Sequence, residues 1–283
     1  MKNILLTIEY DGSGFHGWQI QSQMRTVQGE LQHALERVTG VPVELTGSSR
    51  TDAGVHAWAA AANFHTESGI PTERIPFAAN NMLSDIRIIS AVEKPKSFNA
   101  RFDATAKTYR YLCTAPAMDN NDIGTGEVSV TANPGEEAQP RIITYSSDIF
   151  QRNYRYQLNE NPDKCKMIEA AKHFVGTHDF NSFRTFSPDA PEDAHRTIKE
   201  LNIKETEICD TKENPIKELA ITVTGNAFLY NMVRIIAGTL IEVGLGKRTA
   251  DEMPAIIAAK DRRLAGHTAA AAGLYLERVY FDK

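Results

Sequence analysis

The order in which strand-like and helix-like periodicities follow one another is the feature that most constrains the fold of this chain. Alternating apolar residues predict a strand over 4–10, and a helix is predicted over 27–38, with Thr26 as N-cap and Gly40 after its end. The segments that follow are predicted as strands over 41–45 and 58–64, a helix over 75–82 and a strand over 86–92. The order is therefore strand, helix, strand, strand, helix, strand.

The same order is predicted a second time further along the chain. A strand over 109–114 is followed by a helix over 162–175, with Asn161 as its cap and Pro162 at its first position. The copy is completed by strands over 197–204 and 219–224, a long helix from Phe228 and a final strand over 274–281, with a short additional helix over 251–260. Each copy has the order of a split βαβ, or ferredoxin-like, unit.

We therefore predict an α+β fold of two ferredoxin-like βαββαβ units with mainly antiparallel sheets. The N-terminal unit is expected over residues 1–105 and the C-terminal unit over 106–283. Residues 119–140 are rich in Asn, Asp, Gly, Glu, Thr and Pro and have few large apolar side chains. They predict an exposed loop inserted into the second unit.

Composition bounds the partners and the compartment. The formal net charge of −5 means that any surface for nucleic acid must be a local basic patch. The three cysteines are isolated, which predicts no disulfide framework and no thiolate metal site, and favours a reducing, cytoplasmic setting. The longest apolar run, 227–244, contains Asn231, Arg234 and Glu242 and is too polar for a membrane span.

A glycine-rich segment, Gly12 to Gly17, matches the GxGxxG pattern of dinucleotide-binding proteins. In those proteins a helix opens at once and an acidic residue ends the next strand. Here the helix is predicted only from Val27, and 41–46 ends without an acidic residue. We interpret the glycines as turn residues, and Trp18 as either a packing residue or a substrate contact.

The most informative segment for chemistry is the predicted loop 47–56, which contains Arg50 and Asp52. One interpretation is a tight turn stabilised by an Asx hydrogen bond. The other is a carboxylate that stays ionised in a water-poor cleft because an arginine offsets its desolvation. Arg50 is the local candidate for that arginine. Arg234, in an otherwise apolar predicted helix, is the distant one, unless it only extends its charged end to the surface.

Tyr109 and Tyr111 flank Arg110 in a predicted strand, so their side chains are expected on one face of the sheet. They fit a core or sheet-surface role. They also fit a platform on which an unstacked RNA base would lie.

The segment Arg50-Thr51-Asp52-Ala53-Gly54-Val55-His56-Ala57 resembles the signature of the tRNA pseudouridine synthase A family. Further blocks, in the same order as in that family, are Glu9-Tyr10-Asp11-Gly12, Gly17-Trp18-Gln19, Phe98-Asn99-Ala100-Arg101-Phe102, Tyr109-Arg110-Tyr111, Asp179-Phe180-Asn181-Ser182-Phe183-Arg184, Asn226-Ala227-Phe228 and Met232-Val233-Arg234. The resemblance covers the chain from about residue 4 to residue 276.

The resemblance implies an isomerase that converts uridine to pseudouridine at positions 38–40 of the tRNA anticodon stem-loop, without cofactor or metal. It implies Asp52 as nucleophile, Tyr109 as the tyrosine stacked on the target base, Arg234 as the partner of the aspartate, and Arg50 as an aid to loop shape and base flipping. It further implies an active-site cleft between the two units and a homodimer that holds one tRNA. We add the hypothesis that Tyr109 removes the final proton.

Three features depart from the family pattern. Ser49 stands where a glycine usually precedes the arginine, and would strain the loop if that position needs a positive φ. Tyr230-Asn231 replaces a pair that is often His-His. The insertion near 119–140 is acidic, so we expect it to point away from the tRNA.

Two other classes of protein fit parts of the pattern. A non-catalytic RNA-binding module also uses a ferredoxin-like sheet with surface aromatics, but the basic-glycine-aromatic block of RRM domains is absent and Asp52 would have no task. A small-molecule enzyme built on the glycine-rich segment predicts nucleotide binding that RNA does not compete away.

Overall fold

The computed structural model describes residues 1–116, 148–187, 191–209 and 215–282. Its strands are β1 Lys2–Tyr10, β2 Thr46–Gly47, β3 His56–Thr66, β4 Ile86–Lys94, β5 Ala104–Pro116, β6 Tyr156–Gln157, β7 Gly176–Asp179, β8 His195–Cys209, β9 Pro215–Gly225 and β10 Leu274–Phe281. Its α-helices are α1 Val27–Thr39, α2 Ile75–Asn80, α3 Lys164–Lys172, α4 Met232–Gly244 and α5 Met253–Ala259. The insertion predicted near 119–140 lies outside the described residues.

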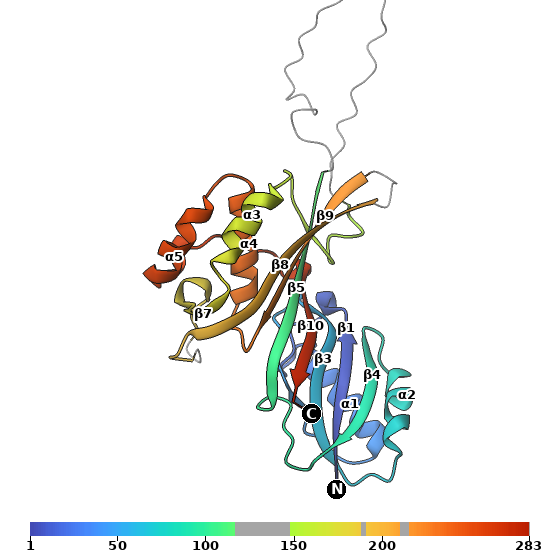
Figure 1. The fold of residues 1–283 in the computed structure, drawn as a ribbon. Coiled ribbons are helices and arrows are strands. Elements are labelled where there is room, and N and C mark those ends of the chain that lie inside the picture. Colours follow the sequence, from blue (N-terminus) through green and yellow to red (C-terminus); the bar gives the residue numbers. More distant parts are fainter. Residues whose placement is uncertain (117–147, 188–190, 210–214, 283) are drawn as a thin grey trace, which may run out of the picture.

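All strands of the described residues belong to one sheet (Figure 1). Its order is β4-β1-β3-β10-β5-β9-β8-β7, with β2 paired to β3 and β6 to β5. Neighbouring strands along this order run antiparallel, except that β10 and β3 are parallel. The prediction of an α+β fold with mainly antiparallel pairing is confirmed.

A short parallel pairing merges the two halves of the molecule. Tyr275 pairs with His56 and Leu276 with Ala57, so the last strand of the described chain lies between strands of the two halves. The sequence predicts a separate sheet in each half, and the structure instead has one continuous sheet. Parallel pairing of such distant segments leaves no turn signal in the sequence.

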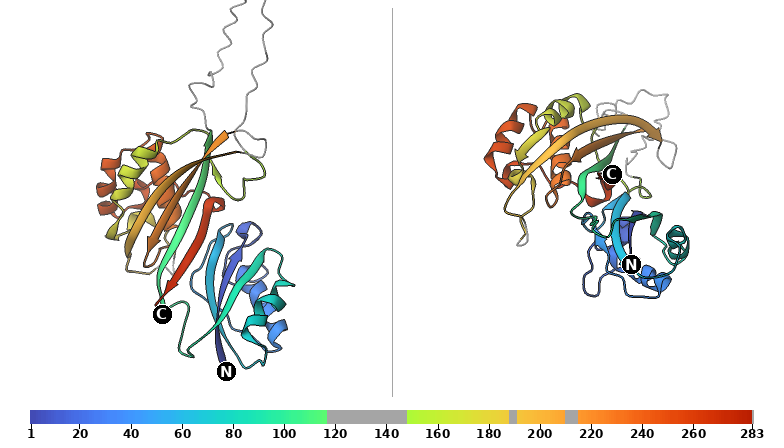
Figure 2. Two further views of the ribbon diagram at one scale, coloured as in Figure 1. Left: turned by 45° about the vertical axis from the view of Figure 1, so that its right-hand side comes forward. Right: turned by 60° about the horizontal axis from the view of Figure 1, so that its bottom comes forward.

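The helices lie in two separate groups (Figures 1 and 2). Helices α1 and α2 pack together on the side of β1 and β4. Helices α3 and α4 pack together against β8 and β5, and α5 lies further out, against β7. Nearly all of α4 is buried, which explains its almost continuous apolar sequence. In the described part of the chain, no helix has the length and apolarity that crossing a membrane requires.

Local signals define α1 as predicted. The Thr26 side chain accepts a hydrogen bond from the Gly29 amide at 3.3 Å, and Gly40 ends the helix in the left-handed region with φ of 73°. Val27, Leu31 and Leu35 are buried on one face. The helix N-cap, its C-terminal glycine and its apolar face are therefore confirmed.

The strand predicted over 41–45 is absent, and only Thr46–Gly47 pair with β3. Val43 and Leu45 are buried as the alternation required. Their backbone groups, however, are bound by side chains of α1: the Val43 amide donates to Glu36 Oε1 at 3.3 Å, and Gln28 Nε2 donates to the Leu45 carbonyl at 2.8 Å. These bonds replace those of a strand ladder.

Two helix starts also differ from the predictions. Asp163, and not Asn161, caps α3, because its carboxylate accepts from the amides of Cys165 and Lys166. Helix α4 begins at Met232 and not at Phe228, because Asn231 adopts a left-handed conformation with φ of 60° that interrupts helical geometry.

Candidate active site

The loop that carries Asp52 is held by close backbone contact with the glycine-rich segment 12–17. A Cβ atom on Gly12 would lie 1.9 Å from the Val55 carbonyl oxygen, and one on Gly17 would lie 2.7 Å from the Thr51 oxygen. The Trp18 amide donates to the Thr51 carbonyl at 3.0 Å. The glycines therefore allow two loops to pack together, and Trp18 is itself buried.

His56 fixes the C-terminal end of the loop that carries Asp52. It is buried, and its Nδ1 accepts from the Gly12 amide at 3.0 Å, so Nε2 carries the proton donated to the Asn153 carbonyl at 2.7 Å. Burial lowers its pKa and keeps the ring neutral. Its ring stacks on Tyr275 of β10 with centroids 4.7 Å apart. The loop that carries Asp52 is thus tied to the strand that joins the halves.

Arg234 is the arginine that the structure brings to Asp52. Its Nη1 lies 3.6 Å from Asp52 Oδ2, and the two side chains are 17% and 32% exposed. At this distance the two groups form an ion pair, but they are too far apart for a normal hydrogen bond. In the described part of the chain, no backbone amide donates to the Asp52 carboxylate, so the Asx turn is not formed.

Burial and charge oppose each other at Asp52. Burial raises the pKa of the carboxyl group above its ordinary value, and the positive charge of Arg234 partly reverses that rise. The carboxylate is held in place by its backbone and retains free lone pairs. This is the state that a nucleophile requires.

Arg234 is held by groups other than Asp52. Its Nε donates to the Ala269 carbonyl at 2.7 Å, and its Nη1 donates to Asn231 Oδ1 at 2.8 Å. Asn231 is fixed in turn, because its Nδ2 donates to Thr185 Oγ1 at 3.0 Å. Sequence reasoning missed Asn231, although asparagine at a helix start signals tolerance of the left-handed conformation.

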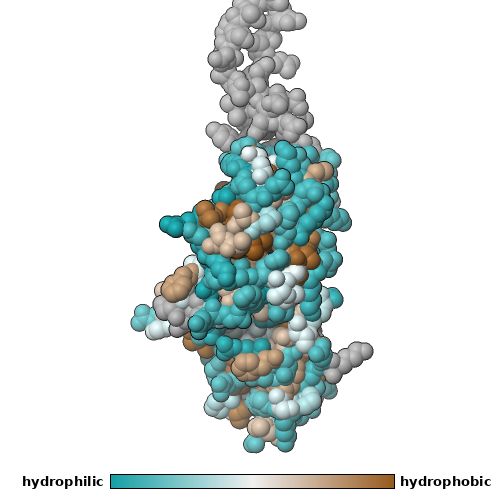
Figure 3. All heavy atoms as spheres, turned by 60° about the vertical axis from the view of Figure 1, so that its left-hand side comes forward, coloured by the Kyte–Doolittle hydropathy of each residue, from teal (hydrophilic) through white to brown (hydrophobic). Residues whose placement is uncertain are grey.

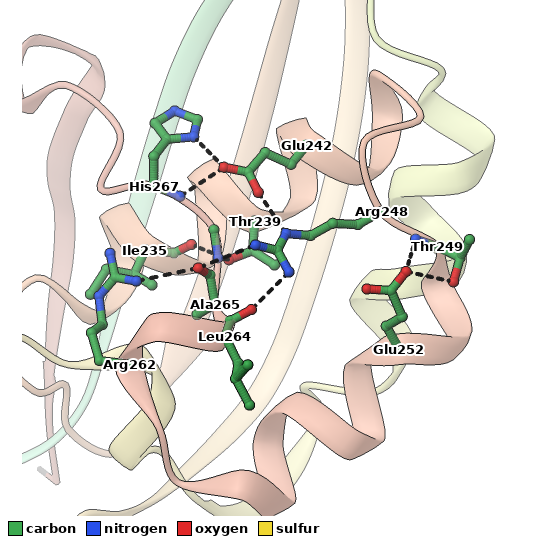
Figure 4. A network of polar contacts seen from close by, with 11 residues as sticks. Ile235, Thr239, Glu242, Arg248, Thr249, Glu252, Arg262, Leu264, Ala265 and His267 are labelled. Carbon is green, nitrogen blue, oxygen red and sulfur yellow. Dashed lines mark hydrogen bonds and ion pairs between the residues drawn. The ribbon is translucent and has the colours of Figure 1, made fainter.

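A polar network holds the loop that provides the Ala269 carbonyl (Figure 4). Glu242 of α4 accepts from Arg248 Nε at 2.6 Å and from both the amide and Nδ1 of His267 at 2.8 Å. Burial alone would raise the pKa of Glu242, but these hydrogen bonds outweigh it and lower the pKa to about 2. The loop before β10 is therefore anchored to the same helix as Arg234.

Tyr109 lies beside the pair on β5. Its ring is buried and packs edge-on against Phe228, with centroids 5.1 Å apart. Burial raises the pKa of its phenol to about 12, the nearby Ser49 hydroxyl lowers it, and the charge of Asp52 raises it. The phenol is protonated at neutral pH. Ser49 has no positive φ, so the serine does not strain the loop.

In the described part of the chain, the side chains of the other predicted residues form no hydrogen bond or ion pair with Asp52 or Arg234. Arg50 is exposed, and within the described ranges its side chain has no hydrogen bond or ion pair. Tyr111 shares the face of Tyr109 but is fully buried and donates to the Ala270 carbonyl at 2.9 Å. Arg110, on the opposite face, binds Glu277 through two hydrogen bonds. Tyr111 is thus a core residue and not a stacking platform.

These contacts define a class of enzyme: a carboxylate fixed by its backbone faces one arginine and a protonated phenol where the two halves of the sheet meet. Among the described residues, no group of three His, Cys, Asp or Glu side chains is placed to hold a metal ion. The side chains of Asp52, Arg234 and Tyr109 themselves offer acid, base and nucleophilic chemistry.

Comparisons with known proteins agree with that class. The sequence model of a family described as tRNA pseudouridine synthase matches residues 6–103 and 170–282, which include Asp52 and Arg234. The chain is 40% identical to the tRNA pseudouridine synthase A of Acetivibrio thermocellus, of Caldicellulosiruptor bescii and of Brevibacillus brevis, over 99% of its own length and 100% of each relative. The chain belongs to the tRNA pseudouridine synthase family.

A solved structure titled "Crystal Structure of a Cbf5-Nop10-Gar1 Complex" is similar with a TM-score of 0.34 and 8% identity, covering 96% of this chain and 57% of that one. A likeness this weak supports no assignment of fold.

Proposed function

We propose that this protein isomerises uridine to pseudouridine in tRNA, at positions 38–40 of the anticodon stem-loop. The observation that carries the proposal is the partly buried Asp52 carboxylate 3.6 Å from Arg234, on a loop fixed by backbone contacts. Membership of the family and the names of its 40% identical relatives support tRNA as the substrate. The positions follow from the resemblance of the Asp52 segment to the family signature.

The chemistry fits the geometry. A uridine in a stem-loop must be flipped out of its stack before a side chain reaches it. Asp52 then attacks the ribose C1′ or the base C6, and the bond between N1 and C1′ breaks. The base turns so that C5 bonds to C1′, and the bond between Asp52 and the nucleotide breaks, which frees the carboxylate. A base removes the C5 proton, and N1 gains one. Because its pKa is raised to about 12, the Tyr109 phenol is protonated at neutral pH and almost none of it is available as a base, which supports a role as aromatic contact.

We infer that the two halves are ferredoxin-like units over 1–105 and 106–283, with the active-site cleft between them. The strand orders β4-β1-β3-β2 and β10-β5-β9-β8 support this, because each is the order expected of a βαββαβ unit. We further propose that Arg50, exposed and two residues before Asp52, enters the RNA and helps to flip the base. A cytoplasmic homodimer without cofactor is the assembly we propose.

The test is tritium release from tRNA labelled at C5 of uridine, with the wild type and Asp52→Asn. We expect release by the wild type alone, because asparagine keeps the shape and removes the nucleophile. Release by both would mean that the nucleophile is misassigned. Binding of tRNA with no release by the wild type would favour the non-catalytic RNA-binding module.

The melting temperature of Asp52→Asn shows whether a loss of tritium release comes from misfolding. The folded-state pKa of Asp52 is raised, so ionising it costs folding free energy as pH rises through that pKa. At pH 7, Asp52→Asn removes this cost, and its melting temperature should equal or exceed that of the wild type.

A further inference from the structure

A hollow beside the active site is not used by the proposed chemistry. Its volume is about 740 Å³, within the range of ligand sites of about 300–1,000 Å³. It lies where the 3₁₀ turn after β7 meets the turn that follows α5, and its lining residues are Asn181, Arg184, Thr185, Phe186, Lys260, Asp261, Arg262 and Thr268. The side of the molecule that carries α5 is mainly hydrophilic, with apolar residues in separate patches (Figure 3).

Cations outnumber anions in this hollow although the whole chain is acidic. Arg184, Lys260 and Arg262 line it with a single carboxylate, Asp261, which is bound by Arg263 at 2.7 Å. Lys260 pairs with Asp179 at 2.9 Å. The chain has a formal net charge of −5, so cations gathered here mark a local preference for an anion.

The arginines still have donors to offer. Arg184 uses Nη1 for the Pro191 carbonyl, and Arg262 uses Nη1 and Nη2 for Ala265 and Thr268. In the described part of the chain, Nε and Nη2 of Arg184 and Nε of Arg262 have no hydrogen-bond acceptor. Free guanidinium donors in a fixed frame suit the oxygens of a phosphate.

The hollow is connected to the catalytic pair through few bonds. Thr185, on its wall, accepts from Asn231, and Asn231 accepts from Arg234. Thr268, also on the wall, precedes Ala269, whose carbonyl accepts from Arg234. At the rim, the ring of Phe186 is 79% exposed. An anion here would lie next to the residues that position Arg234.

We propose that this hollow binds a backbone phosphate of the tRNA beside the flipped-out uridine, an inference that rests on the proposed function. Phosphodiester oxygens accept from Arg184, Lys260 and Arg262, and a neighbouring base stacks on Phe186. The contact fixes the register of the RNA and not its sequence, since phosphate contacts position a nucleic acid without reading it.

The experiment is equilibrium binding of an unmodified tRNA transcript at several salt concentrations, with all proteins carrying Asp52→Asn so that no turnover occurs. The test variant is Lys260→Asn with Arg262→Gln. Lys260 has φ of 54°, a conformation that asparagine tolerates, and Arg184 is left in place because it holds Pro191. The matched control is Lys172→Gln on α3, a 63% exposed lysine that also has an acidic partner.

We expect the slope of log affinity against log salt to become shallower by about 1 to 2, and the affinity near physiological salt to fall about tenfold. The Lys172 control should stay within about twofold of the parent, as expected for a surface charge away from the RNA. With Asp52 restored, KM should rise about tenfold and kcat stay within about twofold, because a positioning contact to phosphate is uniform binding.

A slope and affinity equal to those of the control would overturn the proposal. If melting curves show that the double variant does not fold, the single variants are scored by the same criterion. The outcomes also separate this site from the proposed function. A lowered slope without tritium release by the wild type leaves the phosphate site and removes the activity. Tritium release by the wild type with an unchanged slope in the double variant keeps the proposed activity and removes the phosphate site.

Discussion

The two regions that build the site hold their charged groups in different ways. The loop around Asp52, from the N-terminal half, is fixed by its backbone: two glycines let it pack against segment 12–18, and the carboxylate itself is left without a hydrogen bond from any described residue. At the start of α4, in the C-terminal half, the Arg234 side chain is fixed at its own atoms by Ala269 and Asn231.

The difference shows that a reactive carboxylate and the charged residue beside it are best held in different ways. Hydrogen bonds to a carboxylate stabilise its charge and weaken it as a nucleophile. The loop positions Asp52 through its backbone, and no backbone amide of a described residue donates a hydrogen bond to the carboxylate. Carbonyl and amide oxygens on a guanidinium leave its charge unchanged, since arginine does not deprotonate in proteins. Both groups are therefore held in place, but only the Arg234 side chain is held by hydrogen bonds to its own atoms, and the Asp52 carboxylate keeps its reactivity.

The largest expected effect comes from removing the charge on the arginine side. Arg234→Gln should lower kcat/KM at pH 7 by about 10³-fold, because preorganised charge is lost from the site. Without Arg234, the pKa of Asp52, already raised by burial, rises further. The acid limb of the pH–rate profile should therefore move to higher pH, and part of the activity should return as pH increases.

Arg110→Gln is the control for that profile, because Arg110 binds Glu277 on the opposite face of the sheet. An acid limb that stays in place in Arg234→Gln would show that Arg234 does not set the ionisation of Asp52.

The next effect comes from breaking the backbone packing on the aspartate side. In Gly12→Ala the new Cβ would lie 1.9 Å from the Val55 carbonyl oxygen, so the two loops must separate. We expect the free energy of unfolding to fall by about 3 kcal/mol, with activity lost as well. Urea denaturation measures this, with Gly69→Ala as the control, since its Cβ would meet nothing within 4 Å. Equal stability of the two variants would contradict the packing argument.

A smaller effect separates the two tasks of Asn231. Asn231→Gly and Asn231→Ala both remove the oxygen that binds Arg234, and kcat should fall about tenfold in each, the size expected for one lost hydrogen bond to a charged group. Only alanine also strains the backbone at φ of 60°, so it should lose about 1 kcal/mol more stability than glycine. Unchanged kcat in the glycine variant would show that Asn231 serves the helix start alone.

The smallest effect is expected at Tyr109. Tyr109→Phe keeps the ring against Phe228 and removes a phenol that is protonated at neutral pH, so kcat should fall less than about fivefold, and the pH–rate profile should keep its shape. Single-turnover rates across pH measure both. A loss of about 100-fold or more, together with loss of the basic limb, would restore the hypothesis that Tyr109 removes the final proton.

The sequence predicted those parts of the molecule that local chemistry determines. Helix α1 has its cap, its terminal glycine and its apolar face within one continuous segment. Chemical grounds made Arg234 a candidate partner of Asp52, because a charge in an apolar helix needs a partner, and left Arg50 as the alternative. The roles of Asp52 and Arg234 came from the resemblance to the family. That Arg234, and not Arg50, lies at the carboxylate depends on how the two halves meet, which no local signal encodes.

The parts that could not be predicted depend on single tertiary bonds. Side chains of α1 bind the backbone of 43–45 and prevent a strand there. The Ala269 carbonyl holds Arg234, and a backbone oxygen is present at every residue, so nothing in the sequence distinguishes this one. The two-residue parallel pairing of β3 with β10 is equally invisible in a periodicity.

The position of β10 also orders events during synthesis. A ribosome releases the chain from its N-terminus, and N-terminal parts fold first. Strand β10 follows every other strand of the described chain and is the one that lies between β3 and β5. Until it emerges, the sheet remains in two pieces, and Asp52 and Arg234 belong to different ones. An unfinished chain can therefore fold in part, but Asp52 and Arg234 come together only after β10, which ends at Phe281, has left the ribosome.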